Sequence, residues 1–365
     1  METDQSAEQY PLPPSVVDAR LYTDPAQFER ELKSIFFKSW LPACPSQDVA
    51  RPKDFAIWEE LRQSVVIARQ EDGSIQAWHN VCQHRGARLV DAAGHCSSGR
   101  FVCPWHGFIY DLSGKLRFAP LRSSFDPECI NGLRLQPVRA TEWAGFVWIC
   151  LSDDVPDLKT YLGDIGAELD WFGLERFDVR YRFDLNLNAN WKMVVDAFNE
   201  TWHVPFTHQE TLSAIVEWGK AHLRICAPHS WMTIPVKGLT DRQPADADHR
   251  EANITHYLAF PNTIFSCFPT HLQTWNIWPV GPDQTHFTAW GMVGPCPEGI
   301  TEEKWVQQNE RDWNHFRAVS SEDARVINGW GTVSHSLGQK QYMFNTPEGR
   351  LTAFHAEIAK RTNEA

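Results

Sequence analysis

Two stretches of the sequence, CQHRGARL at residues 82–89 and CPWHGFIYDLSGKL at residues 103–116, determine how the chain is interpreted. Each stretch contributes one cysteine and one histidine, and the four residues are Cys82, His84, Cys103 and His106. A structural zinc site more often begins with two closely spaced cysteines and ends with two histidines on a helix. One cysteine and one histidine from each of two loops suit a two-iron cluster in which one iron takes two thiolates and the other takes two imidazoles.

The composition restricts the class of protein. The chain has 365 residues, 42% apolar and 22% charged, which is a globular composition and predicts two domains. Its net charge of −12 makes nucleic acids and anionic membrane surfaces poor candidate partners. No apolar run reaches the roughly 18 residues that span a bilayer. The polar N-terminus lacks the pattern of a signal peptide, so a cytoplasmic protein is expected.

The pattern of strand and helix signals predicts an α+β fold with a small all-β domain and a larger domain. Short strands and turns dominate residues 46–155, and the preceding segment 1–45 is expected to pack on the larger domain, residues 156–365. In the larger domain we expect an antiparallel sheet flanked by helices. Its predicted elements are a helix at about 189–203, strand-like stretches at 222–236, 254–268 and 272–294, a polar loop at 240–251, and a long helical region from Thr301 to Gly329.

A second group of potential metal ligands lies on and after the predicted helix at 189–203. Three residues recur at i, i+4 and i+7 and would share one helix face: Asp196, Glu200 and His203. Pro205 disfavours helix just before it, so the chain can turn and bring His208 back to His203. Two histidines and one carboxylate form a facial triad that holds Fe(II) and leaves positions open. Asp196 is interpreted as a solvated charge.

Together these features resemble a known family, the Rieske non-haem iron oxygenases, in their large (α) subunit. The resemblance covers the N-terminal word YTDPAQFERELKSIFFKSW, the two cysteine–histidine stretches and the NWK word that precedes His203, and it is weakest from about 210 to 300. It implies that Cys82 and Cys103 bind one iron of a [2Fe–2S] Rieske cluster. It also implies that His84 and His106 bind the other iron.

The same resemblance implies a mononuclear Fe(II) held by His203, His208 and a distant aspartate. Asp323 matches that aspartate best, and Glu322 is the alternative. Glu200 stands where the family often has an aspartate that bridges the cluster of one subunit to the iron of its neighbour. A carboxylate suits this role because it can accept a hydrogen bond from an imidazole at each end. The family arrangement implied here is a head-to-tail homotrimer.

The resemblance implies an enzyme, a terminal oxygenase that uses O2 and electrons supplied from outside. The predicted reaction is hydroxylation of an aromatic or polycyclic substrate. The alternative is a monooxygenase that N-demethylates a quaternary amine or O-demethylates an aryl ether, because a glutamate at this bridging position also occurs in amine-oxidising members. A carboxylate facing the pocket would favour a cation, and a dry apolar slot would favour a ring. Six tryptophans are candidates to line the pocket: Trp218, Trp231, Trp275, Trp278, Trp290 and Trp330.

The electron source is expected to be a separate protein. The sequence has neither a dinucleotide-binding glycine motif after a strand nor the cysteine spacing of a plant-type ferredoxin. A partner reductase or ferredoxin that draws on NAD(P)H is therefore predicted. A simple electron carrier or sensor is disfavoured, because it would have no need for His203, His208 and Asp323.

Overall fold

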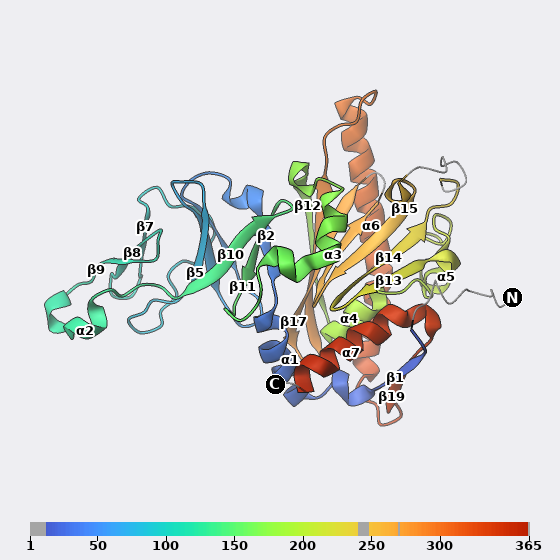
Figure 1. Cartoon of the computed structure of the whole chain (residues 1–365), viewed down its shortest axis with the longest axis horizontal. Helices are drawn as coiled ribbons and strands as arrows, with labels where there is room; N and C mark the ends of the chain where they lie inside the picture. The colour runs from blue at the N-terminus through green and yellow to red at the C-terminus, as the bar shows by residue number, and fades with distance from the viewer. Residues whose placement is uncertain (1–11, 240–247, 269–270, 364–365) are drawn as a thin grey trace. The chain divides into compact units, whose positions relative to one another are not determined.

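The structure is a computed structural model that describes residues 12–239, 248–268 and 271–363 (Figure 1). Its contacts divide the chain after Phe36 and after Tyr161 into a smaller unit and a larger unit that includes both ends of the chain. These divisions lie nine and six residues from the predicted boundaries at 45/46 and 155/156. Most of the predicted polar loop at 240–251 lies outside the described residues. Among the described helices, none is long and apolar enough to cross a membrane.

The smaller unit is built almost entirely of antiparallel strands. Its main sheet contains, in spatial order, β2 (Leu41–Pro45), β11 (Phe146–Cys150), β10 (Pro137–Trp143), β5 (Ile75–His79), β4 (Val65–Arg69), β3 (Asp54–Trp58) and β6 (Gly94–His95). A second sheet contains β7 (Arg100–Val102), β8 (Ile109–Asp111) and β9 (Leu116–Phe118). The sequence FVWIC of β11 is buried at every position, and this strand lies between β10 and β2 in the sheet.

The larger unit contains a seven-stranded sheet in which all neighbours are antiparallel. Its spatial order is β12 (Asp178–Leu187), β18 (Gln284–Val293), β17 (Leu272–Gly281), β16 (Thr263–Cys267), β15 (Asn253–Ala259), β14 (His229–Pro235) and β13 (His222–Cys226). Each predicted strand-like stretch is therefore a hairpin of two strands. The predicted α+β class, with an all-β part and a sheet flanked by helices, is confirmed.

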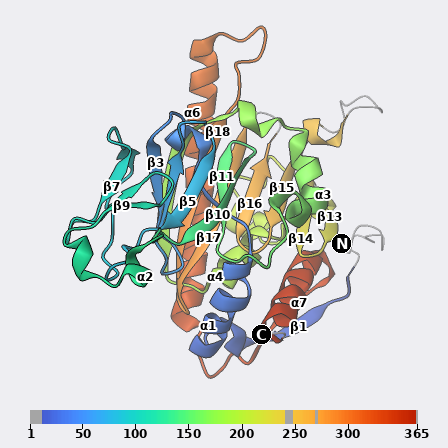
Figure 2. The ribbon, with the colours of Figure 1, turned by 60° about the vertical axis from the view of Figure 1, so that its left-hand side comes forward.

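Helices and a short ribbon complete the larger unit. They are α1 (Pro25–Ser34), α4 (Trp191–Phe198), α5 (Val204–Thr207), α6 (Glu302–Val333), α7 (Gly349–Asn363) and the pair β1 (Ser15–Asp18) with β19 (Gln341–Phe344). The helical stretch α3 (Leu158–Asp170) is broken at Gly163, whose φ is 50°. Helices α4 and α6 pack on the sheet, and α7 packs against β13, β14 and α1. Figure 2 shows α1, α7 and β1 gathered at one end of this unit.

The helix predicted at 189–203 is shorter than expected. Helix α4 ends at Phe198, so the predicted single face carrying Asp196, Glu200 and His203 is wrong. The physical reason is that the Glu200 carboxylate accepts the backbone N–H of His203 at 3.1 Å, which competes with the helical hydrogen bonds. The expected break at Pro205 is also wrong. This proline lies in the first turn of α5, where a missing N–H costs no helical bond.

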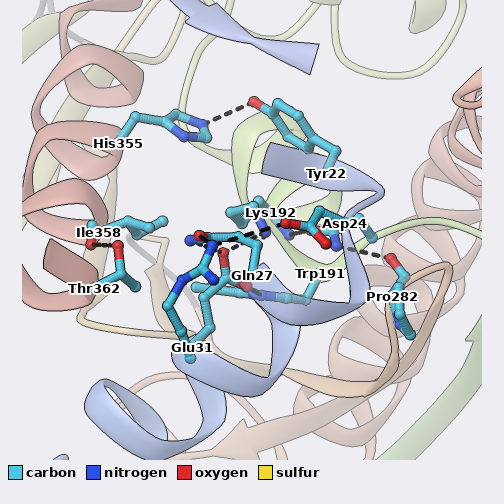
Figure 3. Close-up of polar contacts among 12 residues, drawn as sticks. Tyr22, Asp24, Gln27, Glu31, Trp191, Lys192, Pro282, His355, Ile358 and Thr362 are labelled. Atoms are coloured by element: carbon cyan, nitrogen blue, oxygen red, sulfur yellow. Dashed lines mark hydrogen bonds and ion pairs between the residues drawn. The ribbon is translucent and has the colours of Figure 1, made fainter. Parts of the chain in front are cut away.

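A buried ion pair fastens α1 to α4, the helix that leads into the predicted metal ligands (Figure 3). The Lys192 ammonium lies 2.7 and 2.9 Å from the two oxygens of Glu31, and both side chains are 1% exposed. Trp191 donates its indole N–H to the same carboxylate at 2.8 Å. Because the pair is enclosed, each charge depends on the other for compensation. The NWK word thus anchors the N-terminal segment on the larger unit.

Asp196 is not the solvated charge that the sequence predicted. Its carboxylate is buried, accepts the Tyr22 hydroxyl at 2.7 Å and lies 3.0 Å from Nε2 of His355. Burial, together with the neighbouring Asp196 carboxylate, raises the pKa of Tyr22 well above its usual value. Figure 3 shows Tyr22 and His355 facing each other between the N-terminal segment and α7. This contact supports the same packing as the ion pair of Glu31.

Candidate metal centres

The two cysteine–histidine stretches of the smaller unit form the same kind of turn. The Gly86 N–H donates to the carbonyl of Cys82 at 2.9 Å, and the Gly107 N–H donates to the carbonyl of Cys103 at 3.1 Å. Both glycines have positive φ, 76° and 68°, a conformation that glycine adopts without strain. Each cysteine therefore begins a tight loop that also carries one histidine.

These loops bring the four predicted ligands into two adjacent pairs. Burial raises the pKa of the Cys82 thiol, and the neighbouring Cys103 thiol adds to this effect. The imidazoles of His84 and His106 lie with ring centroids 4.7 Å apart. Nδ1 of His84 is buried and has no hydrogen-bond partner among the described residues. Two thiols and two imidazoles with an unused nitrogen fit the donor set of a Rieske cluster.

Tyr110, which the sequence analysis missed, lies against the first pair. Its hydroxyl is 3.4 Å from Sγ of Cys82 and accepts the backbone N–H of Gln83 at 3.1 Å. Hydrogen bonds to cluster sulfurs are one of the factors that set the reduction potential of an iron–sulfur site. The signal was present within the second stretch, seven residues after Cys103, but only the fold shows that β8 returns this side chain to Cys82.

The outer surface of the loops is aromatic and basic. Trp105 is 62% exposed, and its ring stacks on His106 with centroids 5.3 Å apart. The guanidinium of Arg85 lies 5.4 Å from the ring of Trp105. This exposed tip therefore combines a large flat side chain with a positive charge.

In the larger unit, the second predicted group comes together in space. The metal-binding atoms of His203, His208 and Asp323 all lie within 4.8 Å of one another. Oδ1 of Asp323 is 2.9 Å from Nε2 of His208 and 3.9 Å from Nε2 of His203. Asp323 projects from α6, and the two histidines flank the short helix α5. Two imidazoles and one carboxylate on neighbouring elements match the facial triad of non-haem iron sites.

Two further carboxylates hold the other nitrogen of each imidazole. Nδ1 of His203 is paired with Glu200, and Nδ1 of His208 lies 2.6 Å from Oε2 of Glu322. Each Nε2 is then directed to the common point, as in carboxylate–histidine–metal arrangements. The structure places Glu322, the rival of Asp323, behind His208 rather than among the converging atoms. Adjacent helical residues point about 100° apart, which explains how neighbours serve the two sides of one ring.

The electrostatics of this group favour a cation at its centre. Burial alone would lower the pKa of His203, but the carboxylates of Glu200 and Asp323 outweigh it and raise that pKa. For His208, Asp323 and Glu322 likewise overcome burial and raise the pKa. A site that stabilises a proton on either imidazole also stabilises a divalent metal ion between them. The side chains present therefore fit a mononuclear iron.

A cavity of about 100 Å³ opens beside these three ligands. Its wall is mainly apolar and aromatic, with contributions from Phe198, Val204, Leu212, Val216, Ile234, Ile254, Phe268, Trp275, Phe316 and Val319. The polar lining beyond the triad includes Glu200, His256, His271, Gln273, Asp312 and His315. Of the six candidate tryptophans, Trp275 alone is in this lining, so the expectation that several would gather here is wrong.

A second, larger hollow of about 500 Å³ also has Glu200 in its wall, so this residue lines both spaces. Three carboxylates contribute to its wall: Asp196, Glu200 and Glu348. Burial raises the pKa of Glu348 to about 7, and the charges of Glu200 and Asp196 add to the effect. Trp330 lines this hollow rather than the apolar cavity. The hollow is therefore acidic where the cavity beside the triad is apolar.

Comparison with known proteins agrees with this geometry. Residues 174–364 match the family profile described as the ring hydroxylating alpha subunit, catalytic domain, and residues 39–135 match the Rieske [2Fe-2S] domain. The chain belongs to the ring-hydroxylating oxygenase alpha subunits. It is thus a terminal oxygenase and an oxidoreductase that incorporates O2, with a Rieske cluster domain, a mononuclear iron domain and an external source of electrons. The suspected family, fold and cofactors are confirmed.

Relatives with different substrates match the chain. The glycine betaine monooxygenase oxygenase subunit of Pseudomonas aeruginosa is 24% identical over 354 residues, covering 84% of this chain and 81% of the relative. The large oxygenase component of the naphthalene 1,2-dioxygenase system of the same species is 32% identical over 203 residues, covering 53% and 44%. The carnitine monooxygenase oxygenase subunit of Escherichia coli is 32% identical over 194 residues, covering 53% and 52%.

Solved structures show the same fold. The quaternary ammonium Rieske monooxygenase CntA with L-carnitine has a TM-score of 0.78 at 22% identity, covering 94% of each chain. Naphthalene 1,2-dioxygenase from Rhodococcus sp. bound to indole has a TM-score of 0.76 at 19% identity, covering 95% of this chain and 94% of that one. At these identities the likeness establishes architecture, and the substrate must be argued from the cavity.

Proposed function

We propose that this terminal oxygenase hydroxylates an aromatic substrate. The observation that carries the proposal is the apolar and aromatic wall of the cavity beside His203, His208 and Asp323. Its volume of about 100 Å³ is of the same order as the roughly 150 Å³ apolar cavity that accommodates benzene. An apolar and aromatic wall of this kind suits a ring.

We assign the metal ligands as follows. The Rieske cluster is held by Cys82, His84, Cys103 and His106, and the mononuclear Fe(II) is held by His203, His208 and Asp323. When bound, these groups supply the electron and the O2 chemistry, which is the part of the reaction that protein side chains do not perform. Glu200 and Glu322 fix the imidazole orientations, and buried neighbours such as Val204 exclude water from the triad.

We further propose that Glu200 bridges subunits in a homotrimer. The loops that carry the cluster ligands present Arg85 and Trp105, whereas the hollow beside Glu200 is lined by carboxylates. Opposite charge on these two surfaces supports their docking between copies of the chain. In this arrangement one Glu200 oxygen remains on His203 while the other meets a cluster histidine of the partner.

The bridging proposal is tested by Glu200→Ala. With Fe(II) supplied in excess to offset the weaker hold on His203, we expect the purified variant to keep both metals and the trimeric mass while coupled turnover nearly stops. Metal content, light scattering and product formation with a competent reductase provide the three readouts. Near-normal turnover by the variant would remove the bridging role from Glu200.

The second candidate function is demethylation of a quaternary amine. Three observations favour it. Relatives named for glycine betaine and carnitine match the chain, and a glutamate rather than an aspartate occupies position 200. The carboxylate of Asp312 also lines the cavity. Sequence identity of 24% and 32% leaves room for a change of substrate. The wall of the cavity makes an aromatic body the better fit.

Oxygen uptake separates the two candidates. The reconstituted protein with a generic reductase is screened against aromatic acids, polycyclic hydrocarbons, aryl ethers and quaternary amines. We expect uptake that is coupled to a hydroxylated ring product. Uptake with formaldehyde release from quaternary amines, and none with any ring compound, would replace the aromatic proposal by the demethylase.

A further inference from the structure

One carboxylate of the apolar cavity has no role at the metal triad. The lining contains three acidic residues, Glu200, Asp312 and Asp323, and neither lysine nor arginine. Glu200 and Asp323 are paired with the triad histidines. Asp312 therefore contributes a negative charge to a mainly apolar lining, and this charge is not paired with a triad histidine.

Asp312 lies on the same side of α6 as Asp323 but far from it along the helix. Asp312 precedes Asp323 by eleven positions, which is close to three full helical turns and corresponds to a rise of roughly 16 Å along the helix axis. Phe316 and Val319 occupy the same face between them and line the cavity. The cavity wall thus runs from the triad, over apolar side chains, to a carboxylate at the far end.

No lysine or arginine of the cavity lining neutralises Asp312. Nδ1 of His271 lies 3.4 Å from Oδ2 of Asp312, but burial lowers the pKa of His271 to about 4, so this imidazole is neutral near pH 7. His315, which also lines the cavity, has a buried Nε2 without a hydrogen-bond partner among the described residues. Burial raises the pKa of Asp312 itself, while Arg311 and His315 oppose this. A cationic ligand would relieve the desolvation of this carboxylate.

Aromatic rings stand near the same end. Phe268 stacks on His271 with ring centroids 4.2 Å apart, and Trp275 stacks on Phe316 at 5.8 Å. Ring faces attract cations, and the attraction is stronger where water is excluded. A carboxylate beside the neutral imidazole of His271 and aromatic faces accepts hydrogen bonds and positive charge, and it repels carboxylates.

We infer that Asp312 selects substrates in which an ammonium group, or another cationic nitrogen, is attached to the aromatic body. Asp312 and His271 hold the charged end, and the ring packs on Phe316, on the side of Asp312 that faces the triad. This inference rests on the proposed aromatic function and names the class of substrate within it: aryl and arylalkyl amines. Asp312 acts here as a specificity-determining residue, remote from the reacting carbon.

Binding to the full holoprotein tests the inference with three ligands of similar size. They are 2-phenylethylammonium, 2-phenylethanol and 3-phenylpropionate, measured by anaerobic calorimetry at pH 7.5. We expect the ammonium to bind about 10- to 100-fold more tightly than the alcohol, as a charge-assisted hydrogen bond supplies, and the carboxylate to bind most weakly. Asp312→Asn should reduce the preference for ammonium over alcohol to within about twofold.

Two control variants keep the test decisive. Asp312→Glu retains the charge and should retain the preference, which also guards against a folding defect in Asp312→Asn. Glu310→Gln removes one charge from an exposed position of the same helix outside the cavity lining, and should leave the preference unchanged. Equal binding of ammonium and alcohol, or a preference that survives Asp312→Asn, would overturn the inference while the aromatic proposal stands. Oxygenation of choline and of no ring compound would overturn both.

Discussion

The replacement Glu322→Gln examines how His208, the second histidine of the proposed iron site, is held. His208 is 1% exposed, with Nδ1 2.6 Å from Glu322 and Nε2 2.9 Å from Asp323. The amide of glutamine has nearly the same shape as the carboxylate but carries no charge. The change therefore removes the negative charge behind the imidazole and leaves the triad intact. Thr211, which donates its hydroxyl to the same Glu322 oxygen at 2.8 Å, remains as a partner.

The expected loss is in iron affinity. Outer carboxylates that orient a metal-binding histidine are worth about 10- to 100-fold in metal affinity. This corresponds to roughly 1.4–2.8 kcal/mol. The amide oxygen can still accept the Nδ1–H, and a neutral hydrogen bond has roughly half the strength of a charge-assisted one. We therefore expect a loss of about tenfold, at the lower end of that range.

The assay is anaerobic competition for Fe(II) between the protein and a chelator of known affinity. The visible spectrum of the Rieske cluster serves as an internal reference, since the cluster is bound by the other unit. Thr211→Val is the matched control, because it removes the other hydrogen bond to Glu322 and keeps the carboxylate. An affinity of Glu322→Gln within about twofold of the unaltered protein would refute the outer-carboxylate role.

Three more predictions concern the stability of the fold, the turnover of the enzyme and the reduction potential of the cluster. Lys192→Met should lower the free energy of unfolding by about 3–5 kcal/mol in urea titrations, because it leaves the Glu31 charge buried and unpaired. The double variant with Glu31→Leu should recover most of this loss. A double variant that is as unstable as Lys192→Met alone would contradict the argument. His208→Ala should abolish turnover and leave the Rieske spectrum intact, and loss of that spectrum would disprove separate sites. Tyr110→Phe should lower the cluster midpoint potential by roughly 20–60 mV in redox titration, whereas an unchanged value would show that its hydroxyl does not bond to Cys82.

Local chemistry explains what the sequence could predict. The cysteines and histidines of the smaller unit lie within two short turns, so their spacing alone indicated the kind of site. The α+β class followed from patterns of period two and from short turn signals. The third strand-like stretch contained a visible turn, Gly281-Pro282-Asp283-Gln284, and it folds as a hairpin. The turns at Pro228 and Pro261 were equally local but were overlooked.

Long-range packing explains what the sequence could not predict. Helix α4 ends at Phe198 because the side chain of Glu200 captures backbone N–H groups, and periodicity does not report such a bond. Asp196 is buried by Tyr22 and His355, which are 174 and 159 residues away in the chain. The choice between two adjacent acidic residues on α6 depends on how the helix is rotated against His208, which no local pattern fixes.

The position of Glu200 between two cavities has a further consequence. Its side chain belongs to the walls of both the acidic hollow and the apolar cavity, so it forms part of the barrier between them. Truncation to glycine would open a passage through which bulk water reaches the iron ligands. Oxygen consumption would then exceed product formation, because electrons delivered to a site that is open to water would reduce O2 without hydroxylating the substrate.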